Sequence, residues 1–288
     1  MLKINMVGGG FQHDVCSSAL NNNKYVKWIK DNDRHLDMSA EISFYIDNQI
    51  LLNPNSHIPG KKNYGWLMES SAIIPNVINN VINNIDLYRE RYECIFTHDK
   101  TILNRSDIFK YVIPNAMPWI RNRKIYQKTK DVSIIVSNKS GVEGYSFRLN
   151  QLRRLSEIGG IDHYGRGFKN ELPWVYEYNG IEESGKLIGL KDYRFSFAFE
   201  NANYPGAFCE KLTDCFATGT IPIYWGNPDI GEFFDTNGII IFDENLDLNS
   251  LSEELYLSKM ESIKTNFQLS LDLPSSEDYI YENYLNKQ

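Results

Sequence analysis

The chain has 288 residues, of which 42% are hydrophobic and 23% charged, and its formal net charge is −7. This length is enough for two domains with hydrophobic cores, and the composition excludes a wholly disordered chain. The negative charge argues against a nucleic-acid-binding protein, which would show a basic surface. No apolar run reaches the roughly 18–20 residues that a membrane-spanning helix needs, so no integral membrane association is expected.

The beginning of the chain and the cysteines give an expectation about location. The first ten residues contain too short an apolar stretch for a signal peptide. Cys16, Cys94, Cys209 and Cys215 lack the paired spacing of a zinc site, and a chain of this size needs no disulfide framework. We therefore expect a cytoplasmic protein with free thiols.

The first half of the chain predicts alternating strands and helices. Helical spacing covers residues from about Asp14 to Lys30, and apolar residues recur at helical spacing from Pro75 to Asp86. Apolar runs predict strands at Leu2–Val7, Glu41–Leu51, Tyr64–Met68 and Tyr92–Thr97. The run Glu41–Leu51 is long enough to be a pair of strands or a strand followed by a turn.

The second half repeats this alternation after a predicted linker at Pro114–Lys130. The predicted strands are Asp131–Val136, Tyr193–Glu200, Ile221–Trp225 and Gly238–Phe242, and the predicted helices are Tyr145–Glu157, Ala207–Thr218 and Ser276–Leu285. Short strands that alternate with helices are typical of parallel sheets. Two such sheets predict an α/β protein with two Rossmann-like domains facing a central cleft, across which the last helix packs back.

Residues 193–226 form the most informative segment, a predicted strand, polar loop, helix and second strand. A helix N-terminus offers unpaired N–H groups and a partial positive charge, which suit a phosphate. Glu210 and Lys211 fall in the first turns of that helix, where a carboxylate can hold two ribose hydroxyls and an ammonium can meet a pyrophosphate oxygen. Such a pair seen alone is usually a solvated surface pair. The flanking Phe-Glu-Asn and Gly-Thr-Ile-Pro-Ile-Tyr-Trp-Gly favour the binding interpretation.

With these flanks the segment closely resembles the donor-binding signature of the α1,3-fucosyltransferases, glycosyltransferase family 10, and the resemblance covers roughly residues 133–243. It implies the GT-B fold, with an acceptor-side domain over 1–125, a donor-binding domain over 126–268 and a C-terminal helix over 269–288. It also implies an inverting transfer of a sugar, L-fucose from GDP-fucose, to a carbohydrate acceptor hydroxyl. The partners are then a nucleotide-sugar donor and a carbohydrate acceptor, and no metal or other cofactor is required.

The resemblance assigns donor-binding roles within the segment. Asn201 matches the donor-binding Asn of the family, and Glu210 and Lys211 match the pair that contacts ribose and phosphates. The family usually has Tyr six residues after the Asn, where this chain has Ala207, and Tyr204 is the nearby candidate to replace it. This departure leaves open a different nucleotide sugar as donor. An inactive nucleotide- or carbohydrate-binding protein is the other alternative.

The resemblance assigns two further roles outside that segment. Ser137 and Asn138 end a predicted strand as in the family's donor site, so Arg148 in the following helix takes the role of neutralising the pyrophosphate. Glu69 ends an apolar strand in the first half, as a loose match to the family's catalytic base. The alternative for Glu69 is a carboxylate that caps the next helix.

Other motifs carry weaker signals. Asp31–Asp33 fits the DxD pattern of metal-dependent sugar transferases, but it follows a predicted helix, and short Asp/Asn clusters are common turns. The five histidines show no HxxxH or HExxH pairing, so zinc is not supported. Gly8–Gly10 lacks the GxGxxG spacing and predicts a tight loop near the acceptor.

Overall fold

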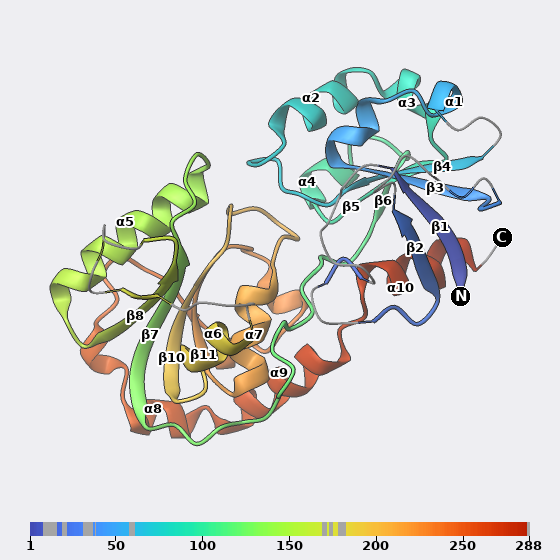
Figure 1. The fold of residues 1–288 in the computed structure, drawn as a ribbon. Helices are drawn as coiled ribbons and strands as arrows, with labels where there is room; N and C mark the ends of the chain where they lie inside the picture. The colour runs from blue at the N-terminus through green and yellow to red at the C-terminus, as the bar shows by residue number, and fades with distance from the viewer. Residues whose placement is uncertain are drawn as a thin grey trace. The chain divides into compact units, whose positions relative to one another are not determined.

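The computed structural model describes residues 1–7, 16–18, 22–30, 37, 39–57, 61–168, 172, 175–177 and 183–286. Asp31–Asp33 and Gly8–Gly10 lie outside these ranges. The chain divides by its internal contacts into two compact units (Figure 1). The first unit is Met1–Asn115, Tyr204–Ala207 and Pro274–Gln288, and the second is Ala116–Asn203 and Phe208–Leu273. The acceptor and donor roles assigned to 1–125, 126–268 and 269–288 stay predictions.

The first unit contains a six-stranded parallel sheet with strand order β2-β1-β3-β4-β5-β6. Its strands are β1 (Leu2–Val7), β2 (Val26–Lys30), β3 (Ile42–Ile46), β4 (Lys62–Leu67), β5 (Cys94–Thr97) and β6 (Phe109–Tyr111). The helices between them are η1 (Asp47–Leu51), α1 (Pro54–His57), α2 (Pro75–Asn83), α3 (Ile85–Arg91) and α4 (Lys100–Leu103).

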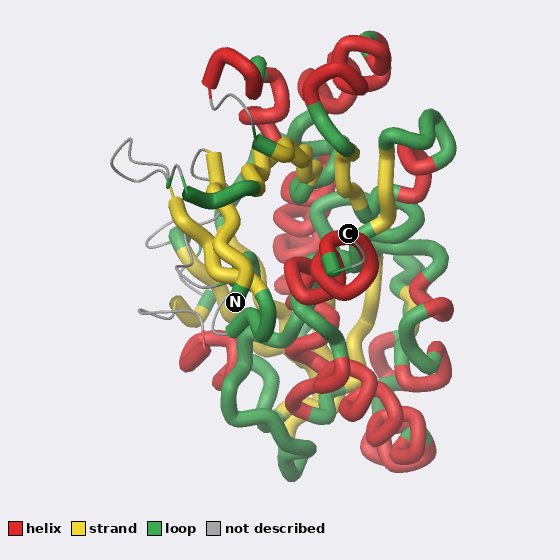
Figure 2. Tube along the Cα trace, turned by 90° about the vertical axis from the view of Figure 1, so that its right-hand side faces the viewer, coloured by secondary structure: helices red, strands yellow, loops and turns green. Residues whose placement is uncertain are grey.

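Both faces of this sheet are buried, as expected for parallel strands. Phe44 packs on one face against α10 (Ser276–Ile280) and its π-helical continuation η5 (Tyr281–Leu285). Its neighbour Tyr45 packs on the opposite face, in the cluster that contains the apolar side of α2. Figure 2 shows the last helical segment, in red, running to the C-terminus. The predicted terminal helix therefore exists and covers the sheet of the first unit.

The helix predicted from Asp14 to Lys30 is wrong at its end, because Val26–Lys30 is strand β2 and pairs with β1. Val26 and Trp28 are buried and Lys27 between them is exposed, which is the period of two of a half-buried strand. Pairing with β1 therefore makes this segment a strand, although its sequence has helical spacing.

The second unit contains another six-stranded parallel sheet, with strand order β12-β11-β10-β7-β8-β9. Its strands are β7 (Lys130–Ser137), β8 (Ile161–Arg166), β9 (Tyr176–Glu177), β10 (Tyr193–Phe199), β11 (Ile221–Trp225) and β12 (Ile240–Ile241). Its helical elements are α5 (Glu143–Ile158), α6 (Glu183–Ile188), α7 (Glu210–Thr218), η2 (Ile230–Glu232), η3 (Thr236–Gly238), η4 (Leu248–Ser250), α8 (Glu253–Ser258) and α9 (Met260–Asp272). Among the described residues of both units, no helix has the length and apolar character needed to cross a bilayer.

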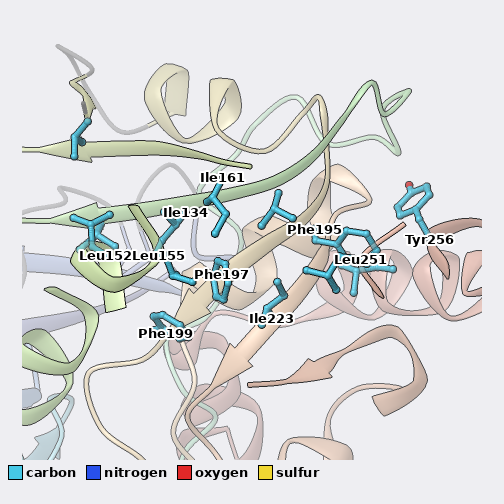
Figure 3. Close-up of a cluster of buried hydrophobic side chains, with 14 of the residues drawn as sticks. Ile134, Leu152, Leu155, Ile161, Phe195, Phe197, Phe199, Ile223, Leu251 and Tyr256 are labelled. Atoms are coloured by element: carbon cyan, nitrogen blue, oxygen red, sulfur yellow. The ribbon is translucent and has the colours of Figure 1, made fainter. Parts of the chain in front are cut away.

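Side chains of β10 alternate between the two faces of this sheet. Phe195, Phe197 and Phe199 join a buried cluster with Leu152 of α5 (Figure 3), whereas Ala198 packs in the cluster that contains the buried side of α7. The sheet is thus covered by helices on both faces, and the carboxyl ends of β10 and β11 lead into the loops before α7 and η2. Open α/β sheets bind their ligands at this edge.

The loop between β10 and α7 includes a short segment that belongs to the first unit. There the Tyr204 hydroxyl lies 2.8 Å from Nε2 of His98, and the Lys100 N–H donates to the Pro205 carbonyl at 3.2 Å. Gly206 has a φ of +92°, and a Cβ at this position would lie 2.2 Å from the His98 carbonyl oxygen. A side chain does not fit here, so glycine is required.

Candidate functional site

Helix α7 begins at Glu210, three residues later than the predicted start at Ala207. Cys209 before it is extended, with φ −143° and ψ −172°, and its N–H donates to Oε1 of Glu200 at 2.9 Å. The Glu200 carboxylate therefore occupies one of the N–H groups that a helix start leaves unpaired. Glu210 and Lys211 are the first two residues of the helix.

Glu200 is the acidic residue of the Phe-Glu-Asn sequence, and the structure makes it the support of this helix start. Its own N–H donates to the Trp225 carbonyl at 2.9 Å, and its Oε2 accepts the Cys209 thiol at 2.7 Å. A Cβ on Gly226 would lie 2.5 Å from Cγ of Glu200, so only glycine leaves room for this carboxylate. Burial raises the pKa of Glu200. Sequence reasoning missed this role, although the position directly after a strand was a signal for it.

Lys211 is held beside the same groups. Its Nζ lies 2.9 Å from Sγ of Cys209, 3.9 Å from Oε2 of Glu200 and 4.0 Å from Oε1 of Glu210. Burial alone would lower the pKa of Lys211, but the neighbouring Cys209, Glu210 and Glu200 together hold it above its usual range. The ammonium therefore keeps its charge at neutral pH.

Glu210 is held by a cation that the sequence did not reveal. Nζ of Lys186 in α6 lies 3.0 Å from Oε1 of Glu210 and 2.8 Å from Oδ2 of Asp214, and it stands 4.4 Å from the ring centroid of Trp119. Burial would raise the pKa of Glu210, but Lys186 and Lys211 outweigh burial and hold it well below its usual range. These two cations therefore favour the charged carboxylate form of Glu210, which accepts hydrogen bonds.

Arg148 lies in α5 and Asn201 in the loop after β10, and the two elements are in contact. The Gly144 N–H in the first turn of α5 donates to the Asn201 carbonyl at 3.1 Å, and a Cβ on Gly144 would lie 2.2 Å from that oxygen. One turn later, the Arg148 guanidinium lies over the Tyr145 ring, 4.6 Å from its centroid, and the residue is only 4% exposed. Burial lowers the pKa of Arg148.

Two polar atoms in this place lack a hydrogen-bond partner within the described part of the chain. They are Nε of Arg148 and Oδ1 of Asn201, both buried. Electrostatic interaction also couples Arg148 to Cys209, Glu200 and Glu210. Buried polar atoms are normally paired, so each of these two atoms is available to a polar ligand.

For the remaining predicted donor-site residues, Ser137, Asn138 and Tyr204, the structure gives contacts with residues outside the cluster at the start of α7. Ser137 ends β7 as predicted, and the Asn138 side-chain amide donates to the Gly167 carbonyl at 2.6 Å, which joins the ends of β7 and β8. Tyr204 belongs to the first unit through its hydrogen bond to His98. Donor binding by Ser137, Asn138 and Tyr204 stays a prediction.

Glu69 is exposed and follows β4 in the first unit, as predicted. Oδ1 of Asp47 accepts the N–H groups of Met68 at 2.8 Å and of Glu69 at 3.0 Å. Burial, with a smaller contribution from the Glu69 charge, raises the pKa of Asp47 to about 7. Asp47 has a φ of +50°, and no other non-glycine residue described here has a positive φ. Sequence reasoning missed Asp47, although an acidic residue directly after buried strand Ile42–Ile46 was a signal for it.

No group of three or more His, Cys, Asp or Glu side chains is arranged to hold a metal ion in the part of the chain that the structure describes. A reaction without a metal, Glu69 as its base and a cytoplasmic location all stay predictions.

Comparison with known proteins connects this site to a family. Residues 125–269 match the model of the C-terminal part of glycosyltransferase family 10 (fucosyltransferase). The α-(1,3)-fucosyltransferase FucT of Helicobacter pylori is 25% identical over 184 residues, which are 62% of this chain and 35% of that protein. The GDP-fucose protein O-fucosyltransferase 3 of Bos taurus is 28% identical over 110 residues, 38% of this chain and 23% of that protein. This chain thus spans about a third or less of the length of these relatives.

A solved structure agrees with the fold. The crystal structure of an α1,3-fucosyltransferase with GDP-fucose matches 94% of this chain and 90% of its own, with a TM-score of 0.50 and 13% identity. The two parallel-sheet units therefore have the GT-B fold that the resemblance implied. The matched range 125–269 is half of the chain and contains Arg148, Asn201, Glu210 and Lys211. On this evidence the chain belongs to glycosyltransferase family 10.

Proposed function

We propose that this chain is an inverting glycosyltransferase that transfers L-fucose from GDP-fucose to a hydroxyl of a carbohydrate acceptor. The observation that carries the proposal is the buried Arg148, whose Nε is unpaired among the described residues and whose charge is electrostatically coupled to Glu210 and Lys211, the first two residues of α7. Cations next to a helix N-terminus suit a diphosphate. Family membership supports a nucleotide sugar, and the similarity to the bovine GDP-fucose protein O-fucosyltransferase 3 supports GDP-fucose.

On the donor side, Arg148 and Lys211 bind the diphosphate and Glu210 accepts the ribose hydroxyls. When the bond between the anomeric carbon and the β-phosphate oxygen breaks, negative charge develops on the departing GDP. The two cations stabilise that charge, and their hydrogen bonds to it are charge-assisted. Because both side chains are already largely buried and held by neighbours, little reorganisation is needed at this step.

On the acceptor side, Glu69 removes the proton from the attacking hydroxyl while that oxygen forms its bond to the anomeric carbon from the face opposite GDP. The products are the fucosylated acceptor, GDP and the proton on Glu69. The position of Glu69 after a strand of the first unit supports this role, since sugar acceptors need a carboxylate or imidazole within reach. Asp47 holds the Glu69 backbone through its hydrogen bond.

Turnover measured as GDP release from GDP-fucose, with a panel of carbohydrate acceptors, tests the proposal. We expect Lys211→Ala and Arg148→Ala each to reduce turnover by about 10²–10³-fold. Lys264→Ala and Arg153→Ala, which change exposed lysine and arginine side chains, serve as matched controls and keep wild-type rates. Wild-type rates in both site variants, with their fold intact, would refute the proposal.

A second candidate uses the same fold with a different nucleotide sugar. Ala207, which stands where the family usually has Tyr, favours it, because alanine brings no hydroxyl to the sugar or phosphate. Calorimetric titration with GDP and UDP, followed by turnover of GDP-fucose against GDP-mannose, separates the two. Tighter binding of UDP would support the second candidate.

A further inference from the structure

We propose that Lys186 is a positioning residue that fixes the Glu210 carboxylate for the ribose hydroxyls of the nucleotide. The inference rests on the proposed function and adds a residue to it. Lys186 lies in α6, 24 positions before Glu210, and its Nζ is 3.0 Å from Oε1 of Glu210. The Lys186 side chain is 12% exposed and that of Glu210 is 15% exposed, so water screens this ion pair only weakly.

Lys186 is itself anchored by groups other than Glu210. Its Nζ also donates to Oδ2 of Asp214 at 2.8 Å, and the Asp214 side chain is 1% exposed. The other oxygen of Asp214 accepts the N–H groups of Trp119 at 2.7 Å and Ile120 at 3.1 Å. Because Asp214 is held by the backbone and the Trp119 ring lies against the ammonium, the position of Lys186 does not depend on Glu210.

This anchoring gives Glu210 a fixed orientation before any ligand arrives. Glu210 is the first residue of α7 and has no helical turn before it to restrict its side chain. A carboxylate accepts several hydrogen bonds, so one bond from Lys186 leaves acceptor capacity for ribose hydroxyls. Nζ of Lys211 is 4.0 Å from Oε1 of Glu210 and also lies near Cys209 and Glu200. Lys186 therefore makes the shorter contact with Glu210, at 3.0 Å. A side chain that is already ordered loses less freedom when the ligand binds.

The test compares two ligands that differ only at the ribose. Binding of GDP and of 2′,3′-dideoxy-GDP is measured by calorimetry on the wild type, Lys186→Met and Glu210→Gln. The wild type is expected to prefer GDP by about tenfold or more, the size of a hydrogen bond to a charged group. In Lys186→Met this preference falls toward one, because GDP binds less tightly while dideoxy-GDP is unaffected. Glu210→Gln gives the same loss, and the double variant gives no further loss.

Each other outcome contradicts the inference in a recognisable way. Equal weakening of both nucleotides in Lys186→Met would show a general structural role, and an unchanged preference would show no role. Lys186→Arg keeps the charge and is expected to restore part of the preference, which guards against a folding defect in the Met variant. Lys264→Met is the matched surface control. A wild type that binds neither nucleotide would overturn the proposed function itself, whatever Lys186 does.

Discussion

The carboxylate of Glu200, the residue directly after strand β10, accepts the backbone N–H of Cys209, the residue directly before helix α7, at 2.9 Å. This bond closes the loop that carries Asn201 and places Glu210 and Lys211 at the first turn of α7. The Phe-Glu-Asn sequence thus has a physical meaning beyond ligand contact, because its Glu is part of the scaffold.

Two substitutions of Glu200 distinguish the contribution of its hydrogen bonds to Cys209 from the contribution of its negative charge. Glu200→Ala removes both hydrogen bonds to Cys209 and is expected to lower the free energy of unfolding of the second unit by about 1–3 kcal/mol. Glu200→Gln keeps an oxygen that can accept the N–H, so most of that stability remains. Urea denaturation of the three proteins gives the comparison. An alanine variant as stable as the wild type would mean that the hydrogen bonds to Cys209 contribute nothing.

Gly144→Ala tests the contact between α5 and the donor loop. The new Cβ would lie 2.2 Å from the Asn201 carbonyl oxygen, so α5 or the loop must shift. We expect a loss of about 1–3 kcal/mol in stability from this overpacking, and weaker GDP binding because Arg148 moves with its helix. Asn150→Ala, at an exposed position of α5, is the control for stability and for GDP binding. If Gly144→Ala matched that control in both measurements, the contact would be unimportant.

Glu69→Gln tests the catalytic base. Loss of general-base catalysis is expected to reduce kcat by about 10²–10⁴-fold, while the Kd for GDP stays at the wild-type value because Glu69 does not bind the donor. Steady-state kinetics and calorimetry measure the two quantities. Glu41→Gln, exposed in the same unit, is the matched control. A normal kcat in Glu69→Gln would contradict the assignment of Glu69 as the base, and Asp47 would be the next carboxylate to test.

His98 predicts a pH dependence of stability. Burial lowers the pKa of His98 to about 4, from an ordinary value near 6.5. Between these values the unfolded chain binds a proton that the folded chain does not. The free energy of unfolding therefore falls as the pH decreases from about 6.5 toward 4, by up to about 3 kcal/mol for this group.

The measurement for His98 is urea denaturation of the wild type and His98→Gln between pH 7.5 and 4.5. Both lose stability on acidification through their carboxylates, but the loss in His98→Gln is expected to be smaller by about 2–3 kcal/mol at pH 4.5. Identical pH profiles would show that His98 is not neutral in the folded protein.

The sequence predicted two interior apolar strands correctly and an edge strand with two lysines incorrectly. Leu2–Val7 and Ile221–Trp225 have the predicted bounds, because both are mostly apolar and mostly buried, as strands of a parallel sheet covered on both faces are. Val26–Lys30 is the end of the segment from about Asp14 to Lys30 that was predicted as a helix, and its strand character depends on pairing with β1. The residues next to Val26–Lys30 in the sequence carry no information about this pairing with β1.

The candidate site could be predicted where one contiguous motif carries it. Glu210 and Lys211 begin helix α7, and Arg148 is electrostatically coupled to both, while their roles in donor binding stay predictions. Lys186 could not be predicted, because it reaches Glu210 from a different helix and no local pattern marks it. The helix start at Ala207 was wrong for a similar reason, since residues 204–207 pack with the first unit.

A crystal structure of the protein with GDP tests the central claim most directly. We predict diphosphate oxygens at about 2.7–2.9 Å from Nζ of Lys211 and from the guanidinium of Arg148. A diphosphate bound elsewhere, with both side chains in the contacts described above, would contradict the account.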